Sequence, residues 1–331
     1  MRIRSFVRGT ALLASLAAAP AFAQGGAVNP ACTDTAFVGP AHDGGNACQI
    51  AFDAFAYATQ QYAILLSAGN LQPGYGDATG GLGHFRIAFN VTGMNLAAPA
   101  LNTTTINPGP PAAGTVNTQP TDFAIFALNA SVGLFGGFDA GIGKMGAIDG
   151  WVSLNGVPGA SASGYSVSPS KKFYFGWGAR IGILQEGKVA PGIGVSYLQR
   201  NLPSSTVYAT DVLENGFTVV GMKIDTHAWA ATVGKHLGAV SLLVGAGQTN
   251  FSSSANVSWY LNGQHPTVQP QVTASSMQTQ FFGDFGILLG GFGITLEVGQ
   301  VEGSTLKTYN TFDPTAGSAR SFASLTVSFG E

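Results

Sequence analysis

The sequence contains very few charged residues. Asp, Glu, Lys and Arg make up 9% of the 331 residues, whereas an ordinary soluble domain has roughly 25%. So few charges could hardly cover the surface of a soluble protein. Beyond the N-terminal leader there is no run of about 18 apolar residues, which excludes a membrane-spanning helix. Low charge, 47 glycines and a positive mean hydropathy together favour a transmembrane β-barrel.

Basic residues are scarce and partly confined to the N-terminus. Arg2, Arg4 and Arg8 precede a short apolar run at residues 11–19, and Ala21-Phe22-Ala23 forms a small-x-small cleavage pattern. These features predict a secretory signal peptide over residues 1–23. Its removal takes three of the 14 basic residues and leaves 11 against 16 acidic ones, a net charge of about −5. Nucleic acid is therefore excluded as a partner, because no basic stripe remains.

Cysteine is nearly absent. Cys32 and Cys48 are the two cysteines, and an oxidising periplasm would allow them to form a disulfide. The bond would close a loop of about 16 residues and stabilise the fold by roughly 3 kcal/mol. The alternative is a metal or redox pair, but the spacing fits neither a CxxC motif nor a zinc site. The sequence predicts neither a metal nor any other cofactor.

Residues 24–82 form a separate N-terminal segment in this interpretation. Asn46 can cap a helix over residues 47–67, and Gly69 and Asn70 suit its C-terminal end. The helix is rich in aromatic and aliphatic residues and carries one charge, Asp53, so it must pack on other parts of the protein. We expect a periplasmic cap or packed extension rather than a plug inside the lumen.

The sequence pattern of residues 83–331 predicts an all-β, transmembrane, antiparallel up-and-down barrel. Alternating residues predict ten strands, at 83–95, 122–134, 137–154, 172–184, 188–199, 217–235, 239–251, 272–288, 292–301 and 319–329. Residues 205–213 could add a further strand or a hairpin, which makes twelve the second possible number. Lys144 interrupts the alternation of the third strand and predicts a bulge near residues 143–146.

The connections between these strands alternate in length. Those at 135–136, 185–187, 236–238 and 289–291 are short, and those at 96–121, 155–171, 200–216, 252–271 and 302–318 are long and polar. Outer-membrane barrels have short periplasmic turns and longer extracellular loops. An even number of strands then places both termini in the periplasm.

The two faces of the strands differ in chemistry. Phe85, Ile87, Phe89 and Val91 exemplify an apolar face that we expect to meet lipid. The opposite face carries the residues predicted to line the lumen: His84, Arg86, Arg180, Lys223, Asp225, His227, Asp284 and Glu297. These charges either form a paired network that fills the lumen or line a narrow pore. Four tryptophans near strand ends predict an aromatic girdle: Trp151, Trp177, Trp229 and Trp259.

No pattern of catalytic residues is evident. The sequence lacks GxSxG and HExxH motifs. Asp225 and His227 lie two residues apart on one strand, a spacing that is common by chance, so no catalytic residue and no enzymatic activity are predicted.

The last strand, residues 321–329, alternates apolar and small polar residues and ends close to Phe329. It resembles the C-terminal closing strand of bacterial outer-membrane β-barrels, although members of that group usually end on the aromatic residue and here Gly330 and Glu331 follow. The resemblance implies that Phe329 is an assembly signal read by the barrel-assembly machinery and that outer-membrane lipid surrounds the protein.

Two further resemblances concern the start of the barrel. Residues 67–70 (Ser-Ala-Gly-Asn) followed by residues 80–86 (Gly-Gly-Leu-Gly-His-Phe-Arg) resemble a group of uncharacterised outer-membrane proteins, in which a short helix leads through a glycine-rich link into the barrel. The N-terminal segment is also similar to that of hydrophobic-compound transporters, which place it in the lumen, but no residue carries over from them.

Two functions remain open from the sequence. The first is a narrow channel or transporter for a small solute, with the N-terminal segment as a cap or plug. The second is a non-conducting structural or surface-binding barrel whose long loops contact an extracellular partner of unknown identity.

Overall fold

The computed structural model describes residues 26–330, with gaps at 101–102, 142, 157–158, 163–164, 212, 267–268, 304–306 and 313–316. The predicted signal peptide, residues 1–23, lies outside the described residues. Ten antiparallel strands close into a barrel, which confirms the predicted fold class. They are β1 (Phe85–Pro99), β3 (Thr118–Phe135), β6 (Ala147–Gly156), β9 (Phe173–Leu184), β10 (Gly192–Asn201), β12 (Gly216–Leu237), β13 (Val240–Tyr260), β14 (Gln271–Leu289), β15 (Phe292–Val301) and β17 (Arg320–Gly330).

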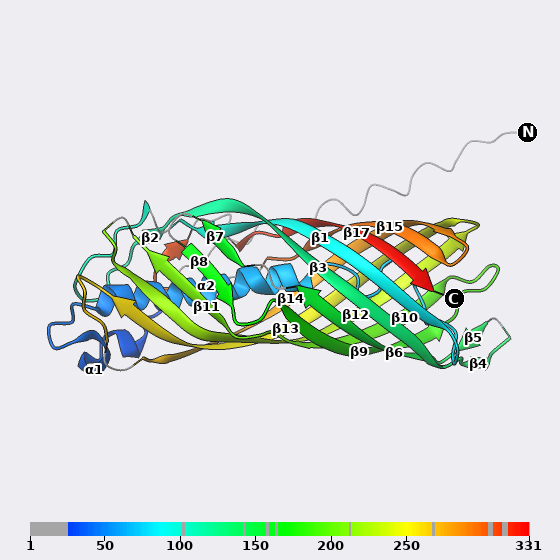
Figure 1. Ribbon diagram of the computed structural model, residues 1–331, viewed down its shortest axis with the longest axis horizontal. Helices are drawn as coiled ribbons and strands as arrows, with labels where there is room; N and C mark the ends of the chain where they lie inside the picture. Colours follow the sequence, from blue (N-terminus) through cyan, green and yellow to red (C-terminus); the bar gives the residue numbers. More distant parts are fainter. Residues whose placement is uncertain are drawn as a thin grey trace, which may run out of the picture.

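One end of the barrel is formed by tight connections, and we call it the short-turn end. Two-residue turns join β12 to β13 and β14 to β15 there. Gly290 and Gly291 have φ of 54° and 84°, the left-handed conformation that a type I′ hairpin requires at both central positions. The barrel closes where β1 pairs with β17, from Arg86 opposite Gly330 to Met94 opposite Phe322. The C-terminus lies at this same end (Figure 1).

The opposite, long-loop end extends the barrel wall. A strand of about 9–11 residues crosses a bilayer, yet β12 has 22 residues and β13 has 21. Three short strands continue the sheet beside β12: β7 (Ala160–Ala162), β8 (Tyr165–Pro169) and β11 (Ser205–Thr210). The possible extra strand at 205–213 is therefore β11, which lengthens the wall without adding to the closed ring. The strands β2 (Thr115–Val116) and β16 (Thr311–Phe312) pair in parallel.

The predicted bulge near Lys144 is wrong. A small hairpin of β4 (Phe138–Asp139) and β5 (Lys144–Met145) occupies this region, and β6 begins only at Ala147. Positive φ values at Gly137, Gly141, Gly143 and Gly146 give the chain this tight path. Lys144 thus belongs to the hairpin and does not interrupt a membrane strand.

The outer surface of the barrel near the short-turn end is apolar. Phe85, Ile87, Phe89 and Val91 are 38–47% exposed, as the alternation in β1 predicts, and the neighbouring strands continue the band with residues such as Leu296. A contiguous exposed apolar band on a closed barrel fits the hydrocarbon core of a bilayer. Among the described residues, no helix has the length and hydropathy needed to cross a membrane.

The N-terminal segment lies inside the barrel, which corrects the expectation of a periplasmic cap. After η1 (Pro30–Cys32) and α1 (Thr35–Val38), the helix α2 (Gly45–Ser67) runs along the lumen in the long-loop half (Figure 1). Nearly every residue of α2 is buried. Its aromatic residues pack against inward residues of the wall such as Phe217, Val257 and Trp259. An apolar helix that could not remain bare in water is thus covered by the apolar inner face of the extended strands.

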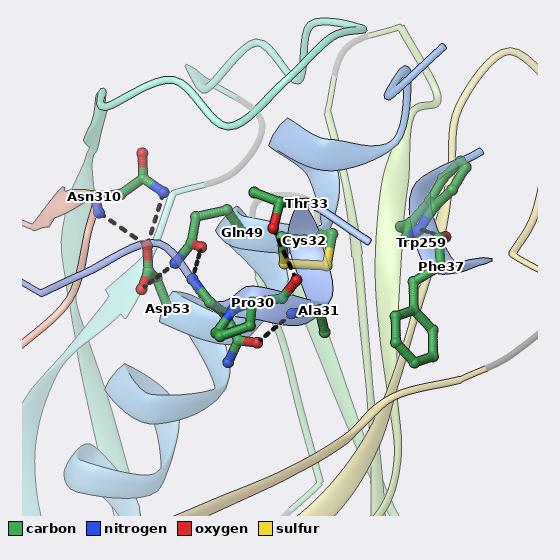
Figure 2. The surroundings of a disulfide bond; sticks show 11 residues. Pro30, Ala31, Cys32, Thr33, Phe37, Gln49, Asp53, Trp259 and Asn310 are labelled. Atoms are coloured by element: carbon green, nitrogen blue, oxygen red, sulfur yellow. Dashed lines mark hydrogen bonds between the residues drawn. A yellow bond between two sulfur atoms is a disulfide. The ribbon is translucent and has the colours of Figure 1, made fainter. Parts of the chain in front are cut away.

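The predicted disulfide between Cys32 and Cys48 is present, at the long-loop end. It ties η1 to the first turns of α2 (Figure 2). Beside it, Asp53 accepts hydrogen bonds from Gln49 at 3.1 Å and from the backbone and side chain of Asn310, both at 2.8 Å. Burial of Asp53 raises its pKa, and these hydrogen bonds offset only part of that effect. The start of α2 is therefore fastened to the loop that carries β16.

Candidate functional site in the lumen

Residues 68–84, which we call the lumen segment, fill the lower lumen in the short-turn half with their first part and reach the exposed rim at residues 82–84. The segment leaves the end of α2 and runs to the start of β1. Its backbone contacts the wall directly where both sides carry glycine. A Cβ at Gly76 would come within 2.5 Å of the Gly234 nitrogen and 2.9 Å of the Gly192 oxygen, and one at Gly133 would come within 2.1 Å of the Gly81 oxygen. Only glycine allows this approach.

Polar groups of the wall hold the first part of the lumen segment. The Asn70 backbone N–H donates to Glu297 at 2.8 Å, and the Asn70 side chain donates to Asp284 at 3.0 Å. Asp284 also accepts from the Gly74 N–H at 2.8 Å. Gln280 both donates to and accepts from the Gly69 backbone. Four backbone or side-chain donors of the segment thus end on three side chains from β14 and β15.

Asp284 and Glu297 face each other across the strand pair and are 4% and 0% exposed. Their carboxyl groups are therefore neighbours on the inner face of the wall. Among the described residues, Asp284 Oδ1 and Glu297 Oε1 have no hydrogen-bond partner. Two adjacent buried carboxylates repel each other strongly. The hydrogen bonds from Asn70 and Gly74 to the other two oxygens therefore stabilise this pair.

Arg180 and Asp149 of the wall meet the middle of the lumen segment. Arg180 donates to Ser196 at 3.0 Å and to the Asp77 carbonyl oxygen at 2.6 Å. Asp149 accepts from both the backbone and the hydroxyl of Thr79, at 2.8 and 2.7 Å. These contacts link β6, β9 and β10 to the segment through buried charge-assisted hydrogen bonds, which are stronger than neutral ones.

Tyr75 and Asp77 close the lumen at the short-turn end. The Arg86 guanidinium lies over the Tyr75 ring, 3.0 Å from its centroid, and the His236 ring lies 5.7 Å away. Asp77 accepts from the Glu186 backbone N–H at 2.6 Å. The β9–β10 turn, which carries Glu186, thus covers the end of the lumen segment.

Glu186 itself pairs with the end of β12. It accepts hydrogen bonds from the His236 ring and backbone, and Lys235 Nζ lies 3.2 Å from its carboxylate. Partial burial raises the pKa of Glu186, but the hydrogen bonds from His236 and Lys235 outweigh burial and leave the pKa below its ordinary value. The turn is therefore held most firmly when this carboxylate is ionised.

No protein-family model and no curated protein sequence matches the chain. Solved outer-membrane barrels are similar to it at low identity. The outer membrane protease OmpT from Escherichia coli is 9% identical, with a TM-score of 0.38 over 75% of this chain and 95% of that one. The transport unit of the autotransporter AIDA-I from Escherichia coli is 12% identical, with a TM-score of 0.37 over 84% and 98%. The Pseudomonas putida toluene transporter TodX is 10% identical, with a TM-score of 0.31 over 81% and 97%.

The predicted lumen-lining residues divide into two groups. Arg86, Arg180, Asp284 and Glu297 lie inside and contact or neighbour the lumen segment, whereas His84 is exposed at the rim before β1. Placing Lys223, Asp225 and His227 in the lumen is wrong, because all three face outward on β12.

A β-bulge in β12 reverses the alternation of this strand. Phe217 and Val219 face inward, but the register shifts between Val220 and Lys223, and Gly221 has a φ of 65°. Below this bulge Met222 and Ile224 face α2, so Lys223, Asp225 and His227, at the alternate positions, point outward. The charges lie on the part of the wall that extends beyond the apolar band.

The predicted girdle is half wrong. Trp177 and Trp229 are 57% and 53% exposed on the outer face, and Tyr197 lies between them and hydrogen-bonds His227 at 2.8 Å. Trp151 and Trp259 are each 4% exposed and point inward. Trp259 donates to the Phe37 carbonyl oxygen of α1 at 3.2 Å, and Trp151 packs beside Leu71 of the lumen segment. Phe329 faces outward, 53% exposed, next to Phe85.

Sequence reasoning missed two charged residues of the lumen, Asp149 and Arg200, which are 0% and 7% exposed. Asp149 shares its inward face with Trp151. A tryptophan near a strand end predicts a position at the membrane interface, so the sequence pattern does not indicate that this face lines the lumen. Arg200 lies at the end of β10, where the pattern placed a long loop. Within the described part of the chain, no group of three or more His, Cys, Asp or Glu side chains is arranged to hold a metal ion.

Proposed function

We propose that this protein is a channel or transporter for small polar solutes in the bacterial outer membrane, closed in this conformation by its own N-terminal segment. The observation that carries the proposal is the size of the inward side chains in the lower lumen. They are small and mostly polar: Thr92, Ser131, Ser153, Gly176, Gly178, Gly194, Ser196, Thr232, Gly234, Ser241, Thr295, Ser324, Thr326 and Ser328.

Small wall residues make the lumen segment necessary for closure. A barrel of eight strands is filled by its own side chains, and a ten-stranded wall could carry larger residues that fill it as well. Here the small side chains of the wall leave space inside the lower lumen, and residues 68–82 occupy it. Hydrogen bonds and glycine contacts hold these residues in place. Buried ionisable side chains within a membrane are costly and mark pathways for solutes by default. The chemistry therefore favours a polar passage with a built-in plug.

The orientation follows from the connections. Short turns of outer-membrane barrels face the periplasm, so the end of the lumen at Tyr75 faces the periplasm. The disulfide then lies at the cell surface, which differs from the periplasmic N-terminal segment that the sequence predicts. The outward Phe329 is the proposed contact for the barrel-assembly machinery, and the apolar band is the proposed contact for outer-membrane lipid.

Planar-bilayer recording tests the proposal. We expect little ion current from the wild-type barrel and a steady current from a variant that lacks residues 26–82, provided that the unboiled variant keeps the heat-modifiable mobility of a folded barrel. A folded deletion variant without current would contradict the proposal. Should the deletion variant not fold, wild-type current in urea concentrations that leave the barrel intact decides the question, since urea weakens the hydrogen bonds of the lumen segment before it unfolds the closed sheet.

A further inference from the structure

Arg200 is a buried cation that pairs with no carboxylate among the described residues. It lies on the inner face of β10 at 7% exposure, and its Nη1 donates to the Leu66 carbonyl oxygen at 3.1 Å. Leu66 belongs to the last turn of α2, where the helix dipole supplies only partial negative charge. Its Nε has no partner. In the described part of the chain the ion pairs within 4.0 Å all involve Glu186, so nothing neutralises Arg200 fully.

A cavity of about 40 Å³ adjoins Arg200 below the end of α2. Such a space holds about three water molecules, which together occupy about the volume of a small carboxylate such as acetate. Trp151 Nε1 and Asn90 Oδ1 are buried without partners, and both residues belong to its lining. The lining is polar on one side and apolar on the other: Asn90, Thr92, Asn129, Ser153, Asn155 and Arg200 supply polar groups, and Leu71, Trp151 and Leu198 supply apolar surface.

Glycines in β9 bring the two main donors together. A Cβ at Gly178 would come within 2.6 Å of Trp151 Nε1, and a Cβ at Gly176 would come within 2.9 Å of Arg200 Cγ. Inward positions two apart on a strand are separated by about 6.6 Å. The indole and the arginine side chain therefore lie side by side over this bare strip of strand, with the cavity next to both.

We propose that this cavity is a binding site for a small monocarboxylate. A guanidinium presents a planar fork that matches a carboxylate, and a single buried cation is neutralised by a monoanion, whereas a phosphate dianion would leave a buried negative charge. The indole N–H is an additional donor, and Leu71 and Leu198 accommodate a short alkyl group. The inference deepens the proposed function, on which it rests for its biological meaning, by naming the solute class.

Binding is tested with ¹³C-acetate as the probe. We expect saturation transfer from the detergent-solubilised full chain to the acetate methyl group, and affinity reduced about tenfold or more in Arg200→Gln because a charged hydrogen bond is lost. Trp151→Phe keeps the ring and removes only the N–H, and we expect a several-fold weaker interaction. Lys223→Gln removes a cation on the outer face and serves as the matched control. The proposal would be overturned if saturation transfer in Arg200→Gln or in Trp151→Phe equalled that of the wild type while the variant kept the heat-modifiable mobility of a folded barrel.

Acetate uptake into proteoliposomes separates this inference from the proposed function. Binding that depends on Arg200, without uptake by either the wild type or the plug-deleted barrel, supports the site and removes the transport function. Uptake that is unchanged in Arg200→Gln supports transport and removes the site. Uptake that falls with the binding affinity in Arg200→Gln and stays at the wild-type level in Lys223→Gln supports both.

Discussion

The two halves of the N-terminal segment close the same lumen by different means. The helix α2 is fixed by aromatic and aliphatic packing, with Phe55 and Tyr57 each 1% exposed and Tyr57 stacked on Phe312 at 4.4 Å. The lumen segment has few apolar contacts and depends on hydrogen bonds to Asp284, Glu297 and Asp149. Apolar packing is lost only when the whole surface separates, whereas polar contacts can be exchanged for water one by one. The lower half is thus the part suited to opening.

The largest expected effect lies in the upper half. Replacing Phe55 by Ala removes a buried ring between α2 and the wall and should destabilise the protein by about 3–5 kcal/mol. Equilibrium unfolding in denaturant measures the change. Phe89→Ala, on the lipid-facing surface at 47% exposure, is the control and should cost clearly less. Similar losses in the two variants would mean that α2 adds little to stability, and the contrast between the halves would disappear.

Gly76→Ala tests the glycine contacts of the lower half. The new methyl group would approach the Gly234 backbone at 2.5 Å, and relief of that overlap should cost about 1–3 kcal/mol and displace the lumen segment. Hydrogen exchange should become faster in peptides from residues 68–82 and remain unchanged in α2. Gly93→Ala, whose Cβ has no neighbour closer than 3.9 Å, is the matched control. Faster exchange in α2 as well would show that the halves open as one unit.

The buried Asp284 and Glu297 pair predicts different results for two substitutions of Glu297. Glu297→Gln keeps an acceptor for the Asn70 N–H and supplies an N–H beside Asp284, so stability should stay within about 0.5 kcal/mol of the wild type. Glu297→Ala leaves the Asn70 N–H without a partner and should cost about 1–3 kcal/mol. Thermal unfolding of both variants checks this. Equal destabilisation would contradict a role for these hydrogen bonds in holding the lumen segment.

The smallest expected effect concerns pH and the β9–β10 turn. Because the pKa of Glu186 is lowered in the folded state, its contribution is fully present above the unfolded value, about 4.3. That contribution is lost as the pH falls through the folded value. Glu186→Gln should flatten the acid limb of a stability–pH profile by less than about 1 kcal/mol. An acid limb that is the same in Glu186→Gln as in the wild type would show that Glu186 does not help to close the short-turn end of the lumen.

Much of the barrel follows from sequence patterns, because alternation and glycine turns are local features. The strands at 272–288 and 292–301 correspond closely to β14 and β15, and the two-glycine turn marks the hairpin between them. Placement of the helix does not follow in the same way. A helix that is apolar all round requires cover but does not say which surface provides it, and the matching apolar wall at Phe217 and Val257 is assembled only by the fold.

The charged residues also show that a local sequence pattern does not determine which surface a residue faces. Alternation predicts that Lys223, Asp225 and His227 lie in the lumen, yet Trp229 has the same parity and faces outward. The bulge at Gly221 reverses the face of the sheet on which the following residues of β12 lie. Asp284 and Glu297, in contrast, lie on regular strands within the apolar band, where alternation alone places them inside.

The seam between β1 and β17 has a consequence for how the molecule is made. The helix and the lumen segment precede β1 in the chain, and β17 is the last strand, so this seam joins the earliest and the latest parts of the barrel. Residues 45–81 lie inside the closed ring, and a finished cylinder of hydrogen-bonded strands offers them no side entrance. Biogenesis must therefore either close the sheet around this N-terminal segment, with the pairing of Arg86–Met94 and Phe322–Gly330 as the last step, or thread the segment through one end of the finished barrel.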